Sequence, residues 1–217
     1  MIKLTLLARE IDKLKERILL LGGKVEERVK MSVSSVRQRD KALAEQVIDG
    51  DREIDLMEVD LEEECLKILA LHQPVAVDLR FIVTVLKVNN DLERIGDLAV
   101  NIAEVSVFLA RCPGLQFPFD FEQMASKAEQ MLANSLNALV DQDVELAEKV
   151  RRSDDEVDDI HEAMYISAAE AMKQQPDRID CLIKTMSISR ALERIADLST
   201  NIAEDVIYLA EGSIVRH

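Results

Sequence analysis

The sequence contains nearly the same stretch twice, and this repeat constrains the fold more than any other feature. "LERIGDLAVNIAE" begins at Leu92, and "LERIADLSTNIAE" begins at Leu192. Over 91–104 and 191–204, 10 of 14 positions are identical. A second pair, "RDKALAEQV" at 39–47 and "QDVELAEKV" at 142–150, aligns at a slightly larger offset. The pattern predicts an internal duplication with two copies of one structural unit.

The composition favours helices in both copies. Only 3% of the residues are aromatic and only 6 are glycine, whereas 48% are hydrophobic. Such a composition suits helices better than strands. Proline is excluded from helix interiors, and it occurs only within "HQPVA", "RCPGLQFPFD" and "QQPDR". We therefore expect helices over 4–37, 41–71, 76–111, 119–140, 144–173 and 178–211.

These helices predict an all-α protein made of two similar antiparallel three-helix bundles. The segment "CPGLQFPF" divides the chain near its middle, so the expected repeats are residues 1–112 and 113–217. An alternative arrangement joins all six helices into one longer bundle. Gly22 and Gly23 are expected to interrupt the first helix, and Gly50 is expected to bend the second, with no functional role for these bends.

Charge and cysteine content restrict the expected partners and environment. The chain carries 42 acidic and 27 basic residues, a formal net charge of -15. This charge repels nucleic-acid phosphates and anionic lipids, so cations and basic surfaces are the expected partners. No stretch is long and uncharged enough to span a membrane. Cys65, Cys112 and Cys181 are scattered, which predicts reduced, mostly buried thiols in a cytoplasmic protein.

An acidic stripe runs along the repeated helix of each copy. In the first copy the stripe spans an arc of about 80 degrees on a helical wheel, opposite the apolar face. The matching polar positions are Glu93, Asp97 and Asn101, repeated as Glu193, Asp197 and Asn201. A merely solvated face should have diverged faster than the core, and like charges four residues apart mildly destabilise a helix. Retention of the acids therefore indicates a ligand.

The middle helix of each half carries a matching acidic pair. Asp51 and Asp55 lie one turn apart in the first half, with Glu58 and Glu62 on the same face. Asp154 and Asp158 lie one turn apart in the second half, with His161 and Tyr165 at the corresponding places. If the second and third helices are antiparallel neighbours, four carboxylates and an amide oxygen converge in each half. Such ligands suit magnesium, manganese, calcium or iron, so the pattern predicts a hard-cation site with room for several ions.

Two other interpretations use the same residues. The stripes could be ordinary solvated faces whose charge is partly compensated by Arg94 and Arg194. Asp158 and His161 also form the carboxylate-x-x-His pair of di-iron bundles. That pair occurs once, so a ferritin-like oxidase lacks its second ligand set.

Taken together, these motifs resemble the PhoU family of phosphate transport accessory and regulatory proteins. The resemblance spans nearly the whole chain and depends on "GDREIDLMEVDLEEE", "QPVAVDLR" and the two "LERI[GA]DL" helices at their repeated spacing. It implies two three-helix bundles whose E(D)xxxD motifs bind multinuclear metal clusters, whether of iron, manganese, magnesium or zinc. Two departures concern the second half: Ala196 replaces the usual glycine, and "QPDRIDCLI" lacks the DLR of the first half. The second site is therefore expected to be the less certain one.

The resemblance also implies a function and partners. It implies a non-enzymatic cytoplasmic regulator that represses the phosphate-starvation response when phosphate is plentiful. The implied partners are the ATP-hydrolysing subunit of the phosphate ABC transporter and a membrane sensor histidine kinase, and we expect a homodimer. Any contact with the membrane is then expected to run through these proteins.

Two other classes of function compete with this interpretation. A carboxylate-bridged multinuclear metalloenzyme, acting as a hydrolase or an oxidase, would use the same ligands. It needs a substrate pocket, which stripes on outer helix faces do not obviously provide. A purely structural helical adaptor is the third possibility, and it predicts that no metal is bound.

Overall fold

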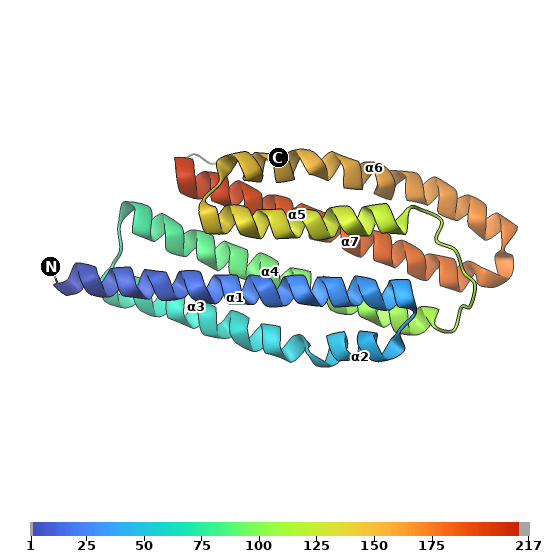
Figure 1. The fold of residues 1–217 in the computed structure, drawn as a ribbon, viewed down its shortest axis with the longest axis horizontal. Coiled ribbons are helices and arrows are strands. Elements are labelled where there is room, and N and C mark those ends of the chain that lie inside the picture. The colour runs from blue at the N-terminus through green and yellow to red at the C-terminus, as the bar shows by residue number, and fades with distance from the viewer. Residues whose placement is uncertain (1, 213–217) are drawn as a thin grey trace.

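The computed structural model describes residues 2–212, and these residues form helices and no strand (Figure 1). The elements in chain order are α1 (Ile2–Gln38), α2 (Lys41–Asp49), α3 (Asp51–His72), α4 (Ala76–Leu109), α5 (Phe121–Asp141), α6 (Val144–Gln174), the short 3-10 helix η1 (Pro176–Arg178) and α7 (Ile179–Glu211). The predicted helices are therefore confirmed, and the bend expected at Gly50 is a break between α2 and α3.

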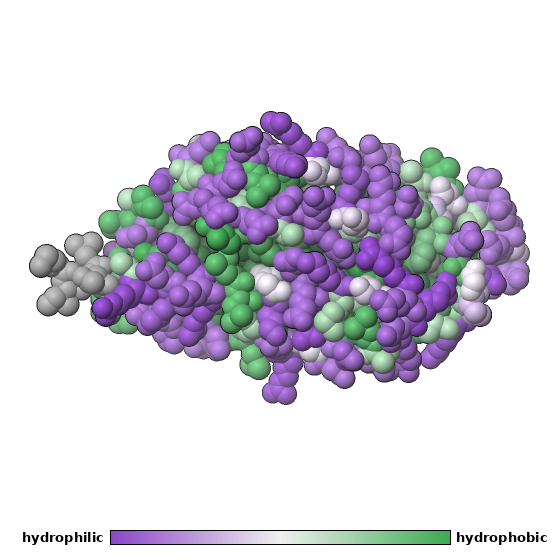
Figure 2. All heavy atoms as spheres, in the orientation of Figure 1, coloured by the Kyte–Doolittle hydropathy of each residue, from purple (hydrophilic) through white to green (hydrophobic). Residues whose placement is uncertain are grey.

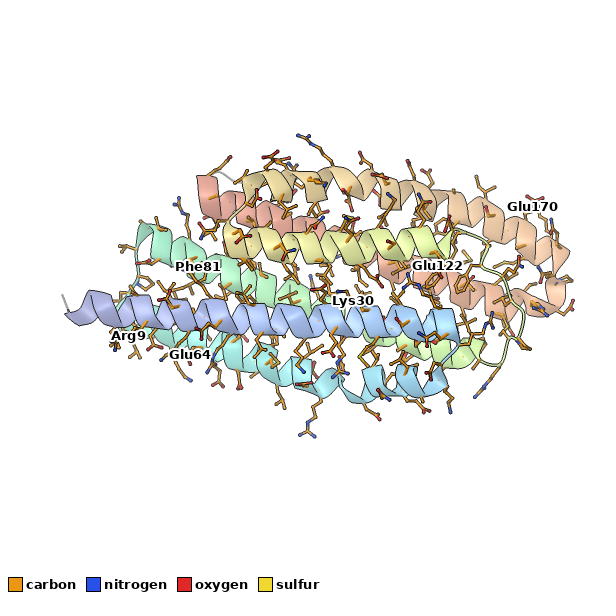
Figure 3. The ribbon with its side chains drawn as sticks, in the orientation of Figure 1. Arg9, Lys30, Glu64, Phe81, Glu122 and Glu170 are labelled. Carbon is orange, nitrogen blue, oxygen red and sulfur yellow. A yellow bond between two sulfur atoms is a disulfide. The ribbon has the colours of Figure 1, made fainter. Side chains whose placement is uncertain are left out.

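The helices form two bundles that pack side by side. In one bundle, α1 and α4 pack with the broken pair α2 and α3, and in the other, α5, α6 and α7 pack together. The bundles meet where α4 packs along α7 and α1 packs along α5. An ion pair links α1 and α5, because Arg37 Nε of α1 donates to Glu122 Oε2 of α5 at 2.6 Å. Figure 3 labels Glu122 on α5. The predicted all-α fold of two similar three-helix bundles is confirmed.

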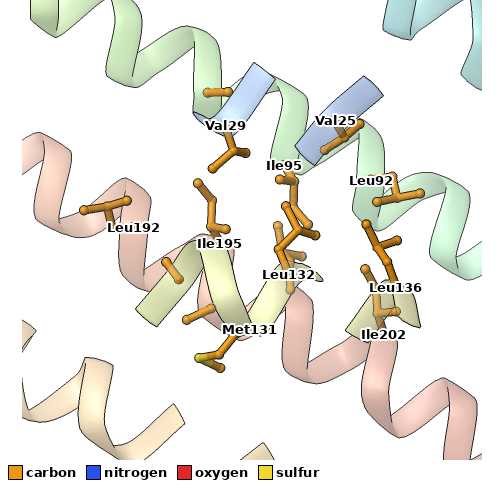
Figure 4. Close-up of a cluster of buried hydrophobic side chains, with 14 of the residues drawn as sticks. Val25, Val29, Leu92, Ile95, Met131, Leu132, Leu136, Leu192, Ile195 and Ile202 are labelled. Atoms are coloured by element: carbon orange, nitrogen blue, oxygen red, sulfur yellow. The ribbon is translucent and has the colours of Figure 1, made fainter. Parts of the chain in front are cut away.

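The core is continuous across both bundles. Figure 4 shows side chains from α1, α4, α5 and α7 meeting at its centre, among them Val29, Ile95, Leu132 and Ile195. All four are buried, at 0% exposure. The apolar face predicted for the repeated helices thus lies against the core. Each fully buried aliphatic side chain of this size contributes about 1.5–3 kcal/mol of hydrophobic free energy.

Aspartates fix the start of a helix at the same place in each repeat. The Asp40 carboxylate accepts a hydrogen bond of 3.1 Å from the Leu43 amide at α2, and Asp143 accepts one of 3.0 Å from the Leu146 amide at α6. Each bond satisfies an amide that the first turn of a helix leaves without a partner. The start of the middle helix in both repeats is therefore set locally by the sequence.

The glycine predictions are half right. α1 runs without interruption from Ile2 to Gln38, so the predicted break at Gly22 and Gly23 is wrong. Gly50 does separate α2 from α3, with φ -85° and ψ -6°. A β-carbon at Gly50 would lie 2.2 Å from Arg28 Nη1, so the bend leaves room for an arginine of α1. Tertiary packing explains both outcomes.

The prediction of reduced cysteines is wrong for two of the three. Cys112, in the connection between α4 and α5, forms a disulfide with Cys181 in the first turn of α7. Cys65 is a free, buried thiol. Scattered positions in the sequence do not exclude a disulfide, because these two lie 69 residues apart and only the packing of the bundles brings them together.

The surface is largely polar. Figure 2 shows a face covered mostly by hydrophilic residues, with small hydrophobic groups between them. Within residues 2–212, none of the helices has a stretch apolar and long enough to cross a bilayer.

Candidate metal centres

Three aspartates converge between α6 and α7. Asp154 and Asp158 lie one turn apart on α6, and Asp197 lies on α7. Each offers a carboxylate oxygen, and these oxygens lie within 4.8 Å of one another. Asp154 is 8% exposed, so one side of the group is closed by the bundle. Three hard oxygen donors at this separation fit a divalent cation such as Mg²⁺, Mn²⁺ or Ca²⁺.

The negative charges of this group are not fully balanced by nearby basic side chains, and they raise the pKa values of its members. Burial, and then the charges of Asp197 and Asp155, raise the pKa of Asp158. Burial also raises the pKa of Glu193 on α7, and the charges of Asp197, Asp158 and Asp154 add to the shift. Glu193 is therefore close enough to the three aspartates for their charges to oppose its ionisation. A bound cation would stabilise the ionised form of all four groups.

Two further polar side chains border the group. Arg194 Nη1 donates a hydrogen bond of 2.8 Å to Asp197 Oδ2. His161 lies one turn beyond Asp158, and its Nδ1 lies 2.9 Å from the Ser189 hydroxyl oxygen. Burial lowers the pKa of His161, which favours the neutral ring. The compensation by Arg194 considered above is therefore present in this half.

The corresponding acids of the first half influence one another across α3 and α4. Burial, and then the charges of Asp55 and Asp97, raise the pKa of Asp51. Burial raises the pKa of Glu93 as well, with contributions from Asp97, Glu58 and Asp55. The side chains predicted as one ligand set thus share one electrostatic environment with Glu58 of the same acidic face.

Local packing explains why α3 and α4 approach here. Gly96 lies so close to α3 that a β-carbon there would be 3.3 Å from Ile54 Cδ1 and 4.0 Å from Asp51 Oδ1. On the other side, Arg28 of α1 donates from Nη2 to Glu53 Oε2 at 3.2 Å, and its charge partly lowers the pKa of Asp51. Asp51 therefore lies between a close helix contact and a partly buried guanidinium.

The sequence favoured the metal site of the first repeat, whereas in the structure the carboxylates converge more clearly in the second repeat. Among residues 2–212, one group of three acidic, histidine or cysteine side chains lies close enough together to hold a metal: Asp154, Asp158 and Asp197. This group lies in the second repeat, where the site was expected to be the less certain one. Asn101 and Asn201, the predicted amide ligands, are exposed. Ala196 in place of glycine has not kept α6 and α7 apart.

A second charged cluster, which the sequence did not indicate, lies where α4 packs on α7. Lys87 of α4 donates to Asp205 of α7, and its ammonium group lies 5.8 Å from the centre of the Tyr208 ring. Burial and the charge of Asp205 raise the pKa of Asp91 to about 6. Asp205 is valine at the matching position 105, so the repeat pattern gave no signal for it.

The sequence is similar to proteins of one known family over most of its length. The model of the PhoU domain matches residues 18–106 and 121–206. The phosphate-specific transport system accessory protein PhoU homolog of Aquifex aeolicus is 37% identical over 97% of this chain and 96% of its own length. The homolog of that name from Deinococcus radiodurans is 42% identical over 75% of this chain and 76% of its own length.

Solved structures show the same architecture. The crystal structure of PhoU from Pseudomonas aeruginosa superposes with a TM-score of 0.91 at 34% identity, covering 95% of this chain and 99% of that one. The phosphate transport system regulatory protein PhoU from Streptococcus pneumoniae superposes with a TM-score of 0.86 at 28% identity, covering 97% and 100%.

Proposed function

The chain belongs to the PhoU family, and we propose on that premise that it is an accessory regulator of a phosphate-specific transport system and binds metal. The relatives are named as accessory proteins of that system, and the match extends over nearly the whole chain. The observation that carries the metal-binding part is the convergence of Asp154, Asp158 and Asp197. We also propose that residues 1–112 and 113–217 are the two repeats, which the two separate family matches support.

Metal binding is proposed at the equivalent place in both repeats. In the second repeat Asp154, Asp158, Glu193 and Asp197 would hold the ion, and in the first Asp51, Asp55, Glu93 and Asp97 would do so. Asn101 and Asn201 remain candidate ligands at the edge. A bound cation would supply positive charge to an acidic surface, and the protein's part is to hold the carboxylates at the right spacing. The donor set favours magnesium, manganese, calcium or iron, with zinc as a further candidate.

The proposed regulation is negative. The protein represses the phosphate-starvation response when phosphate is plentiful, through the ATP-hydrolysing transporter subunit and a membrane sensor histidine kinase. We propose a homodimer that acts from the cytoplasm. The names of the relatives, which describe accessory rather than enzymatic roles, support a non-enzymatic mechanism.

A two-part experiment tests this proposal. Metal content and melting temperature are measured for the purified protein with Mn²⁺, Mg²⁺ or NaCl at equal ionic strength. An ion that binds only the folded protein raises the melting temperature with its concentration. We expect Asp158→Ala combined with Asp197→Ala to abolish part of that rise, and Glu162→Gln, an exposed neighbour on α6, to leave it unchanged. Equal effects of NaCl and Mn²⁺ contradict metal binding.

The second part concerns regulation. A reporter of the phosphate-starvation response is measured in cells that lack the gene and carry either the wild-type or the Asp158→Ala, Asp197→Ala protein. We expect the wild type to repress the reporter in high phosphate and the variant to repress it less. Robust hydrolysis of phosphoesters by the metal-loaded protein, abolished by Asp197→Ala, would instead support the metalloenzyme alternative.

A further inference from the structure

A cavity lies beside the connection between α4 and α5, where residues of both bundles meet. Its volume is about 360 Å³, within the range of about 300–1,000 Å³ that small-molecule sites occupy. Its lining includes Val36 of α1, Ser106 and Leu109 of α4, Leu115 of the connection and Glu122 at the start of α5. The connection crosses the end of the molecule opposite the N-terminus (Figure 1). We call this space the α4–α5 cavity.

Phenylalanines form one wall of the cavity. Three of the chain's five phenylalanines, Phe117, Phe119 and Phe121, fall within five positions of this connection and line the cavity. The rings of Phe117 and Phe121 stack with their centroids 4.7 Å apart, and Phe119 meets Phe117 edge to face at 5.6 Å. Phe121 is buried, whereas Phe117 and Phe119 are only partly covered. Partly covered rings at a cavity pair well with a further flat ring.

Ser106 lacks a hydrogen-bond partner in this lining. It is 2% exposed, and its hydroxyl oxygen forms no hydrogen bond within residues 2–212. Two other buried helical serines do bond, because Ser32 and Ser135 each donate to a carbonyl oxygen three residues earlier at 2.8 Å. A buried hydroxyl without a partner destabilises a folded protein. The matching position of the second repeat is the buried Val206, so this fold does not require a hydroxyl there.

The charged side chains at the cavity are already engaged. Arg37 is paired with Glu122. Arg39 donates to three carbonyl oxygens at the end of α4 and in the connection. Asp120 caps α5 by accepting from an amide of its first turn. Two arginines and two acids in the lining also balance in charge. The cavity therefore favours a neutral molecule, for which the Ser106 hydroxyl is the polar contact.

We propose that the α4–α5 cavity binds a small, neutral, planar aromatic molecule that carries one hydrogen-bonding group. Its ring packs against Phe117 and Phe119, and its polar group bonds to the Ser106 hydroxyl. Leu109 and Leu115, both buried, provide apolar surface around it. Most small-molecule sites combine apolar and aromatic walls with a few polar groups in this way.

Binding at this place has a consequence for the fold. α1 and α4 belong to the first bundle and α5 to the second, so the bound molecule contacts both and stabilises their packing. None of the proposed metal ligands lines the cavity. The proposal therefore goes beyond metal binding and phosphate regulation and does not rest on either of them.

The test uses the full chain in EDTA and 2-naphthol, a neutral two-ring alcohol. The chain contains no tryptophan, so the fluorescence of the probe can be followed directly. We expect saturable binding with a dissociation constant on the order of 100 µM, as for ligands of this size. The melting temperature should rise with the concentration of the probe. Naphthalene, which lacks the hydroxyl, and 2-naphthoate, which is an anion, should both bind more weakly.

Two variants locate the probe. Ser106→Ala should weaken the binding of 2-naphthol about fivefold, because it removes the hydrogen bond, and should leave the affinity for naphthalene equal or higher. Leu109→Phe fills the cavity and should abolish the binding of both. The matched control is Ser135→Ala, which removes a buried hydroxyl that is already bonded and lies outside the lining. If Leu109→Phe does not fold, Ser106→Ala still decides, because it removes a single atom.

Several outcomes overturn the proposal. Absence of saturable binding up to the solubility limit of 2-naphthol removes the site. Equal affinity of Ser106→Ala and the wild type for 2-naphthol removes the role of the hydroxyl, and an equal loss in Ser135→Ala makes the effect a general one. Undiminished binding to folded Leu109→Phe places the probe elsewhere. Tighter binding of 2-naphthoate than of 2-naphthol means that the arginines select an anion.

Discussion

Arg194 and Asp197, three residues apart on α7, are joined by a hydrogen bond of 2.8 Å from the guanidinium Nη1 to the carboxylate Oδ2. Asp197 is the aspartate that α7 contributes to the group with Asp154 and Asp158. A cation that binds there competes with the arginine for the same carboxylate group. In the first repeat Arg94 holds the corresponding position, and within residues 2–212 it makes no such bond to Asp97.

The first prediction follows from this competition. Arg194→Gln removes the competing charge, and because the pair is half exposed it contributes only about 0.2–1 kcal/mol. We expect the affinity of the second centre for Mn²⁺ to rise about two- to fivefold, measured by calorimetry. Arg94→Gln is the matched control and should leave the second centre unchanged. A loss of affinity in Arg194→Gln would show that the arginine orients Asp197 for the ion.

The second prediction concerns Asp91, whose pKa burial raises from an ordinary 3.8 to about 6. Since the folded pKa lies above the unfolded one, the folded protein binds the proton more tightly. The stability from this group is fully present below pH 4 and is lost as pH rises through about 6. Asp91→Asn removes the titrating group, so the variant should not lose this stability as the pH rises. Because Asp91 remains partly exposed to solvent, which screens its charge, we expect a gain of only about 1–2 kcal/mol at pH 7.5.

Urea unfolding in EDTA at pH 4.5 and pH 7.5 checks the prediction. The difference between Asp91→Asn and the wild type should shrink toward zero at the lower pH. Asp60→Asn, an exposed change on α3, should show no such pH dependence. A gain that is equal at both pH values would mean that Asp91 does not titrate in this range.

The third prediction uses the two neighbouring glycines of α1. A β-carbon at Gly23 meets nothing within 4 Å, whereas one at Gly22 would lie 2.7 Å from Leu136 Cδ2 of α5. Gly23→Ala should therefore stabilise the protein by about 0.5–1 kcal/mol, as alanine does in helix interiors. Gly22→Ala should gain less or lose stability, because the buried Leu136 side chain must move to make room. Thermal unfolding compares the two, and equal gains would contradict the close contact.

The fourth prediction concerns the disulfide. Its two cysteines lie 69 residues apart, and closing a loop of that length restricts the unfolded chain by about 4 kcal/mol at most. Reduction, or Cys112→Ser, should lower the free energy of unfolding by about 2–4 kcal/mol. In Cys112→Ser a reductant should then have no further effect. Cys65→Ser serves as the control, because its melting curve should keep the full response to reductant.

The sequence by itself determined the helical class, the duplication and the acidic positions. These properties depend on neighbours three or four residues apart. Glu93 and Asp97 fall on one face because of the helical period alone, and Asp40 caps α2 through an amide three residues away. The proline-rich segment likewise ends α4 and separates the bundles whatever packs around it. Features of this kind could be predicted because the chain positions their partners locally.

Only the tertiary structure decided the features that depend on contacts between distant helices. A side chain at position 22 would be crowded because Leu136 of α5 packs against Gly22, and Cys112 meets Cys181 because α4 and α7 pack side by side. The period of α6 could not show that Asp154 is buried and converges with Asp197. Nor could it show that Val75, in a strained turn, stays in solvent. The physical reason is that burial and convergence are set by the relative placement of helices, which a repeat pattern along one helix does not contain.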